Sequence, residues 1–215
     1  MPVSRPDLLQ NVAERIIAAS MVVGGATRAE VVSADAASHA SGVDIVVING
    51  HEARRVKVKA DPYFGVDGRK ISDRALSFYR ADTASFAFEV VANSLTREPG
   101  WTLSSDAQDL YYYYLALSQS PEDIAALMSE RDEVFFSELT VERDELVVLP
   151  MQSVRAWFEL HNAEYVPRPV MLDGFAAWYR LVPRADVVAA IQGVTCVGSL
   201  LEAVADQGAT VRPLS

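Results

Sequence analysis

The chain has 215 residues, and half of them are hydrophobic, which is enough apolar material for one well-packed domain. Its formal net charge of -10 argues against a protein that coats nucleic acid over its whole surface. A single cysteine, Cys196, excludes an internal disulfide framework. The N-terminal residues lack signal-peptide features and no apolar run reaches the length of a membrane span, so we expect a cytoplasmic protein that does not enter membranes.

The first expected element is an amphipathic helix over residues 6–21, and Glu14 lies within it. Apolar residues recur there at helical spacing: Leu8, Leu9, Val12, Ile16 and Ile17. Gly24 and Gly25 end the pattern. A short strand is expected at residues 29–32, followed by a loop.

Residues 43–60 have the pattern of a β-hairpin. The segment 43–48 is rich in β-branched residues, Asn49-Gly50 is a turn signal, and the segment 54–59 alternates apolar and basic side chains. A two-residue and a four-residue loop are both compatible with the pattern. The four-residue loop is preferred because it pairs aliphatic with aliphatic and acid with base across the strands.

In that register Ile45 faces Val56 and Asp44 faces Lys57. Both loops place Asp44 on the same face as Arg55, Lys57 and Lys59, because alternate side chains of a strand share a face. Such a cluster is either a structural ion pair that compensates a buried carboxylate or a functional site.

Residues 51–80 form a basic island in an acidic chain. The segment holds eight basic and four acidic side chains, so its net charge is +4 and the remainder carries -14. A local basic surface could attract a polyanion that the rest of the protein repels. The alternative is a solvated loop with ordinary charge.

Further elements follow along the chain. We expect strands at 85–92 and 110–117, a helix at 121–131, a second hairpin of 134–139 and 146–150 around a turn at 142–145, a helix at 151–165, a strand at 178–182, and helices at 184–191 and 197–205. The tyrosines at 111–114 could stack on nucleic-acid bases. A central strand covered on both faces explains them better, because successive rings point to opposite faces.

These elements predict an α/β fold with a central mixed β-sheet flanked by helices. The sheet is expected to contain the strands at 43–48, 54–60, 85–92 and 110–117. A core over residues 1–165 would carry a C-terminal αβ extension over residues 166–215.

The sequence contains no P-loop, dinucleotide fingerprint, nucleophile elbow or His/Cys set with metal-ligand spacing. It does contain a helix followed by a hairpin. Asp44 stands at the start of the first strand of the hairpin, and the second strand carries Lys59 as the lysine of an x-Lys motif. This arrangement resembles the PD-(D/E)XK nuclease superfamily. The resemblance extends weakly through residues 85–93, PGW at 99–101 and SSDAQDLYYYY at 104–114.

The resemblance implies a restriction endonuclease-like fold, a Mg²⁺ cofactor and hydrolysis of phosphodiester bonds in nucleic acid. Asp44 would hold the metal and Lys59 would stabilise charge at the scissile phosphate. Lys57 departs from the family pattern, since the family has Glu, Asp or Gln there as a metal ligand. Asp61 or Glu89 could supply the missing oxygen.

Other residues would complete the site implied by the resemblance. Glu14 matches a helix-borne carboxylate found in some family members. Arg55, Arg69 and Lys70 are candidate nucleic-acid-binding residues.

Three functions therefore stay open. The first is a hydrolase, namely a metal-dependent endonuclease, and the second is an inactive nuclease-fold protein that binds nucleic acid or a protein. The third is a structural or assembly protein, which could form a homo-oligomer.

Overall fold

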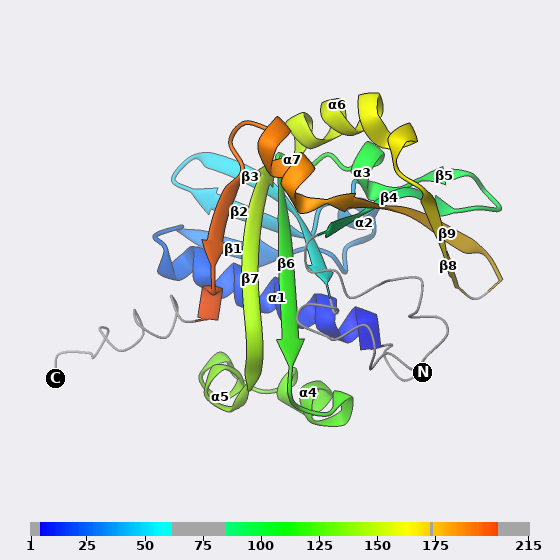
Figure 1. The fold of residues 1–215 in the computed structure, drawn as a ribbon. Helices are drawn as coiled ribbons and strands as arrows, with labels where there is room; N and C mark the ends of the chain where they lie inside the picture. Colours follow the sequence, from blue (N-terminus) through cyan, green and yellow to red (C-terminus); the bar gives the residue numbers. More distant parts are fainter. Residues whose placement is uncertain (1–4, 62–84, 173, 202–215) are drawn as a thin grey trace, which may run out of the picture.

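The computed structural model describes residues 5–61, 85–172 and 174–201, and within them the strands form two sheets (Figure 1). The larger sheet is mixed, in the order β1-β2-β3-β6-β7-β10. Its strands are β1 (Arg28–Val31), β2 (Ile45–Asn49), β3 (Glu52–Asp61), β6 (Asp109–Leu117), β7 (Val141–Pro150) and β10 (Thr195–Gly198). Strands β3 and β6 run parallel, and the other neighbours are antiparallel.

The smaller sheet is antiparallel, in the order β5-β4-β9-β8. Its strands are β4 (Ser85–Asn93), β5 (Glu98–Pro99), β8 (Pro167–Met171) and β9 (Ala176–Pro183). Strand β4 therefore pairs with a strand from the C-terminal third of the chain.

Helices cover both faces of the larger sheet. They are α1 (Arg5–Val23), α2 (Ala36–Ala40), α3 (Trp101–Ser104), α4 (Pro121–Leu127), α5 (Asp132–Glu138), α6 (Met151–His161) and α7 (Arg184–Ala190), with a 3-10 turn at Asn162–Glu164. Figure 1 shows α4 and α5 at one end of β6 and β7, and α6 and α7 at the other.

Two apolar cores lie on opposite faces of the larger sheet. On one face, α1 contributes Val12 and Ile16 to a core that includes Tyr113 of β6. On the other face, Phe86 of β4 packs in a core with Tyr112. Strand β6 is thus buried on both faces, which confirms the structural explanation of the tyrosine run.

The expected helix at 6–21 and the hairpin are confirmed. Strand β2 pairs with β3 in the preferred register, with Ile45 opposite Val56, and the ladder continues to Asn49 and Glu52 around Gly50-His51. Gly50 has φ +60°, a left-handed conformation that suits glycine in this tight turn.

The expectation that residues 85–92 join the same sheet as the hairpin is wrong. Strand β3 pairs with β2 on one side and with β6 on the other, and the side chains of Asp44 and Gln10 complete its edge where β2 ends. Strand β4 consequently finds its partners in β5 and β9, and its buried Phe86 and Phe88 face the larger sheet from the second layer.

The second expected hairpin is also wrong. Residues 132–138 form helix α5, and β7 pairs with β6 through the segment expected to turn. The charged residues there stay in the strand because they have partners: Asp144 accepts from Tyr113 Oη at 2.8 Å, and Glu145 pairs with Arg184.

At the C-terminal end, the helix expected at 197–205 starts later in the structure than the sequence predicted. Val197 and Gly198 belong to β10, helical residues start at Leu200, and residues 202–205 lie outside the described part. Over the described ranges, none of the helices has the length and apolar character needed to cross a membrane.

Candidate functional site

The candidate site lies at a fork in the larger sheet, where β2 leaves β3. Beyond Val56, the edge of β3 that faced β2 is completed by side chains instead of a strand. Asp44 Oδ2 accepts from the amide of Val58 at 2.7 Å. Gln10 of α1 donates to the carbonyl of Val58 at 2.9 Å and accepts from the amide of Ala60 at 3.0 Å. These bonds satisfy backbone groups that would otherwise be buried without partners.

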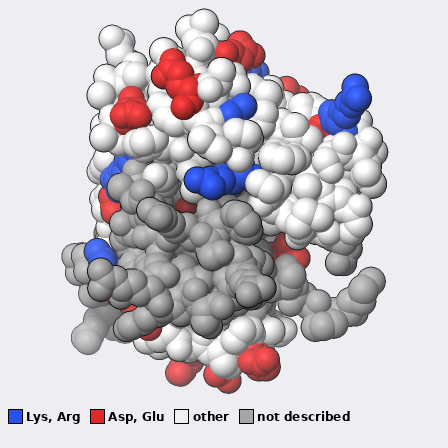
Figure 2. Space-filling model, turned by 45° about the vertical axis from the view of Figure 1, so that its right-hand side comes forward, with Lys and Arg blue, Asp and Glu red and all other residues white. Residues whose placement is uncertain are grey.

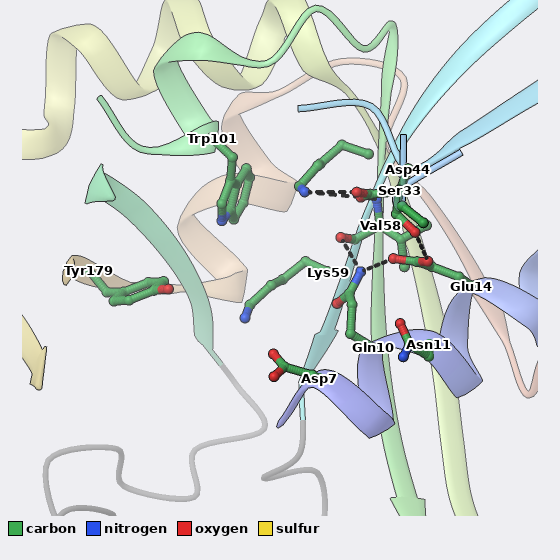
Figure 3. Close-up of a pocket in the computed structure, with 12 residues that line it drawn as sticks. Asp7, Gln10, Asn11, Glu14, Ser33, Asp44, Val58, Lys59, Trp101 and Tyr179 are labelled. Carbon is green, nitrogen blue, oxygen red and sulfur yellow. Dashed lines mark hydrogen bonds and ion pairs between the residues drawn. The ribbon is translucent and has the colours of Figure 1, made fainter. Parts of the chain in front are cut away.

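A cavity of about 380 Å³ opens beside this fork (Figure 3). Its walls come from α1, the segment after β1, the head of β2, strand β3, the start of α3 and strand β9. The lining residues are Asp7, Gln10, Asn11, Glu14, Ser33, Ala34, Asp44, Lys57, Val58, Lys59, Trp101 and Tyr179. The structure therefore gathers Asp44, Lys57, Lys59 and Glu14 around one space.

Asp44 and Lys57 form a largely buried ion pair. The Nζ atom of Lys57 lies 3.1 Å from Oδ1 and 3.0 Å from Oδ2 of Asp44, and the two side chains are 16% and 10% exposed, respectively. Since Val58 also donates to Oδ2, both carboxylate oxygens are engaged. A pair of this kind needs such additional hydrogen bonds to offset the cost of removing two charges from water.

Glu14 is only 2% exposed and is held by two hydrogen bonds. Gln10 donates to Oε1 at 2.9 Å and Ser33 donates to Oε2 at 2.6 Å. Burial raises the pKa of Glu14 above its ordinary value of 4.5, although the hydrogen bonds from Ser33 and Gln10 favour the ionised form. This carboxyl group therefore takes up a proton more readily than an exposed glutamate.

Lys59 extends into the cavity between Asp7 and Tyr179 (Figure 3). Its Nζ atom lies 5.8 Å from the ring centroid of Tyr179. Burial lowers the pKa of Lys59 below its ordinary value, and the negative charges of Asp61 and Glu89 oppose that shift. Within the described residues, no hydrogen bond or ion pair engages this amine.

Asp61 and Glu89 are close enough to influence Lys59 but do not line the cavity. Asp61 accepts from Tyr112 Oη at 2.7 Å. Glu89 accepts from Tyr179 Oη at 2.6 Å and from the amide of Trp101 at 3.1 Å. Across the part of the chain that the structure describes, no group of three or more His, Cys, Asp or Glu residues is arranged to hold a metal ion.

The arrangement does not fit the magnesium ion that the family resemblance implies. Mg²⁺ requires oxygen ligands in near-octahedral geometry. The oxygens of Asp44 already bind Lys57 and Val58, and those of Glu14 already bind Ser33 and Gln10. The ammonium group of Lys57, about 3 Å from Asp44, would also repel a second cation there.

Of the three candidate nucleic-acid-binding residues, the structure describes Arg55. Arg55 is exposed on β3 and does not line the cavity, while Arg69 and Lys70 lie outside the described residues. On the face drawn in Figure 2, the coloured lysine and arginine side chains form separate spots, and acidic side chains lie at both the upper and the lower end.

Four residues important to this geometry were not anticipated: Gln10, Ser33, Trp101 and Tyr179. Gln10 could have been found, since its spacing of four from Glu14 places both on one face of α1. Tyr179 carries no such signal, because only the pairing of β9 with β4 brings it beside Glu89.

Fold and site together define an α/β protein with a mixed sheet, a second antiparallel sheet and a cavity lined by two lysines, Lys57 and Lys59, and by the carboxyl groups of Asp7, Glu14 and Asp44. A scan against protein-family models and searches of curated proteins and of solved structures found no match for this chain.

Proposed function

We propose that this chain is a nuclease-like protein with a restriction endonuclease-like core, and that it binds a phosphate group of nucleic acid in the cavity without Mg²⁺-dependent cutting. The observation that carries the proposal is the position of Lys57. Its ammonium group contacts both oxygens of Asp44, at the place where members of the PD-(D/E)XK nuclease superfamily would hold a metal ion.

The group that would bind an anion in the cavity is Lys59, and the acidic side chains of Asp7, Asp61 and Glu89 compete with the anion for its charge. Asp44 and Lys57 largely neutralise each other, and the raised pKa of Glu14 favours its uncharged form. Lys59 extends its amine into the cavity between Asp7 and the ring of Tyr179. An amine in a partly desolvated site interacts strongly with a phosphate oxygen.

The same geometry explains why hydrolysis is not proposed. Phosphodiester cleavage in the PD-(D/E)XK nuclease superfamily needs a metal ion that neutralises the phosphate and activates water. Here a lysine amine replaces the side-chain oxygen that should help to hold the metal. Lys59 can still position a phosphate, but no described group is arranged to generate the attacking hydroxide.

Binding is tested with labelled single-stranded DNA, duplex DNA and RNA by fluorescence anisotropy over a range of salt concentrations. Wild type should bind at low salt, and Lys59→Met should weaken binding and reduce the salt slope by about the contribution of one phosphate contact. Arg131→Met is the matched control, since it removes one charge from an exposed side chain that does not line the cavity.

Cutting is tested on the same nucleic acids with Mg²⁺, Mn²⁺ or chelator. Wild type should leave every substrate intact, whereas Lys57→Glu should restore the missing oxygen and permit metal-dependent cutting. Metal-dependent cutting by wild type that Asp44→Asn abolishes would show an active nuclease instead. Absence of binding to all three nucleic acids at low salt would remove the proposal and leave a structural or assembly role.

A further inference from the structure

Strand β1 forms one edge of the larger sheet. It pairs with β2 on one side, and among the described residues no strand pairs with its other side. Val32 extends the pairing with β2, because its amide donates to the carbonyl of Asp44 at 2.8 Å. Alternate residues of a strand direct their N–H and C=O groups to the same side, so Glu30 also bonds toward β2, while Ala29 and Val31 direct theirs outward.

The other edge strands of the two described sheets carry features that oppose the addition of a strand. Strand β8 contains Pro167 and Pro169, strand β5 has two residues and one is Pro99, and the pairing of β10 is irregular between Cys196 and Gly198. Prolines, short strands and bulges protect sheet edges from pairing with other chains. Strand β1 has no proline, and its register is regular over all four residues.

The side chains of β1 are complementary to a second copy of the same strand. Arg28 and Glu30 share one face of the sheet and form an ion pair within the chain. In an antiparallel pair of two β1 strands centred on Ala29, Arg28 of each copy lies directly opposite Glu30 of the other copy. The outward groups of the two Ala29 residues then exchange both N–H···O bonds. A parallel pair in register would instead bring like charges together.

Exposed valines lie around this edge. Val22, Val23 and Val31 are 48%, 43% and 47% exposed. Val22 and Val23 end helix α1, and backbone hydrogen bonds hold the turn that leads from them to β1. In the antiparallel pair, Val31 of one copy lies opposite Thr27 of the other, beside that turn. Association would therefore remove apolar surface from water in addition to pairing the backbone.

We infer that β1 is a self-association edge, which pairs antiparallel about Ala29 with β1 of a second copy and joins the larger sheets of two molecules. The four-residue strand makes a contact smaller than the roughly 1,600 Å² of a standard interface, so the dimer should be weak and should depend on concentration. This inference does not depend on the proposed nucleic-acid binding.

Sedimentation velocity over a range of protein concentrations tests the dimer. Wild type should shift from monomer to dimer as the concentration rises. Ala29→Pro removes an N–H group that points away from β2, so it should leave the β1–β2 pairing intact and prevent dimerisation. Circular dichroism melting verifies that this variant is folded. Monomeric wild type at every concentration, or a dimer that persists in folded Ala29→Pro, would overturn the inference.

Charge reversal tests the register and separates association from effects within one chain. Arg28→Glu places two glutamates opposite each other across the interface, and Glu30→Arg places two arginines there. Each variant alone should dimerise about tenfold more weakly than wild type, because like charges directly opposite are destabilising. An equimolar mixture of the two variants should restore association, since each copy then faces the opposite charge. A mixture that associates no better than the separate variants would overturn the proposed register.

Discussion

Gln10 donates to Glu14 Oε1 at 2.9 Å, and the same amide nitrogen also donates to the carbonyl of Val58. One side chain of α1 thereby links a buried carboxyl group to the free edge of β3. Because Ser33 donates to the other oxygen of Glu14, this carboxyl group is fixed between the helix and the segment after β1. Its protonation should therefore be coupled to folding.

The raised pKa of Glu14 predicts a specific pH dependence of stability. Between pH 4.5 and the raised value, the folded protein keeps a proton that the unfolded chain releases. The free energy of unfolding contributed by this group is thus largest at low pH and is lost as pH rises through the folded-state pKa. Glu14→Gln removes the titration, so its stability relative to wild type should increase as pH rises above 4.5 and should level off above the folded-state pKa of Glu14.

Urea unfolding monitored by circular dichroism measures this difference at each pH. Glu138→Gln, at an exposed position of α5, controls for the loss of a negative charge. A Glu14→Gln difference that is constant with pH, or that falls toward neutral pH, would contradict the prediction.

The ion pair between Lys57 and Asp44 predicts a coupled effect on stability. Lys57→Met leaves a buried carboxylate without its counter-charge, which should lower the free energy of unfolding by about 3 kcal/mol. The double variant Asp44→Asn/Lys57→Met removes the unpaired charge and should recover part of the loss. Chemical denaturation of the single and double variants provides the cycle, and additive effects would show that the two groups do not interact.

Magnesium binding can be measured without any nucleic acid. Ligands that bind only the folded state raise the melting temperature. Wild type should melt at the same temperature with Mg²⁺ and with chelator, because Lys57 repels the ion from Asp44. Lys57→Glu should show a Mg²⁺-dependent increase, and the further change Asp44→Asn should abolish it. A clear increase for wild type would show that our assessment of the metal site is wrong.

Asp144 joins the C-terminal segment to the larger sheet. Its oxygens accept from Tyr113 Oη at 2.8 Å, from Ser199 Oγ at 2.6 Å, and from the amides of Leu200 and Leu201 at 2.7 and 3.2 Å. Asp144→Ala should lower stability by about 3 kcal/mol, because several polar groups lose their partner together. Tyr113→Phe removes only one of these bonds and should cost about 1 kcal/mol.

Thermal unfolding and limited proteolysis measure the two effects. Asp144→Ala should melt at a lower temperature and become cleavable near residues 199–201, whereas Tyr113→Phe should resist cleavage like wild type. Early cleavage of both variants, or of neither, would show that Asp144 does not retain the segment.

Local sequence patterns were sufficient for several parts of the fold. The hairpin register follows from the turn at Gly50 and from the match of Ile45 with Val56, because a slip by one residue would move every apolar side chain to the wrong face. The same local logic placed the tyrosine run in a strand covered on both faces. It also brought Asp44, Lys57 and Lys59 to one side of the hairpin, where they line one cavity.

Only the tertiary structure decided which strands share a sheet and which side chains complete the cavity. Strand β4 lies in the second sheet because β2, β6 and the side chains of Asp44 and Gln10 already occupy both edges of β3, and such competition for edges involves segments far apart in sequence. For the same reason Tyr179 could not be assigned to the site, since the pairing of β9 with β4 brings it there. The sequence by itself determined the charged face of the hairpin, whereas nonlocal strand pairing determined the aromatic wall that faces Lys59.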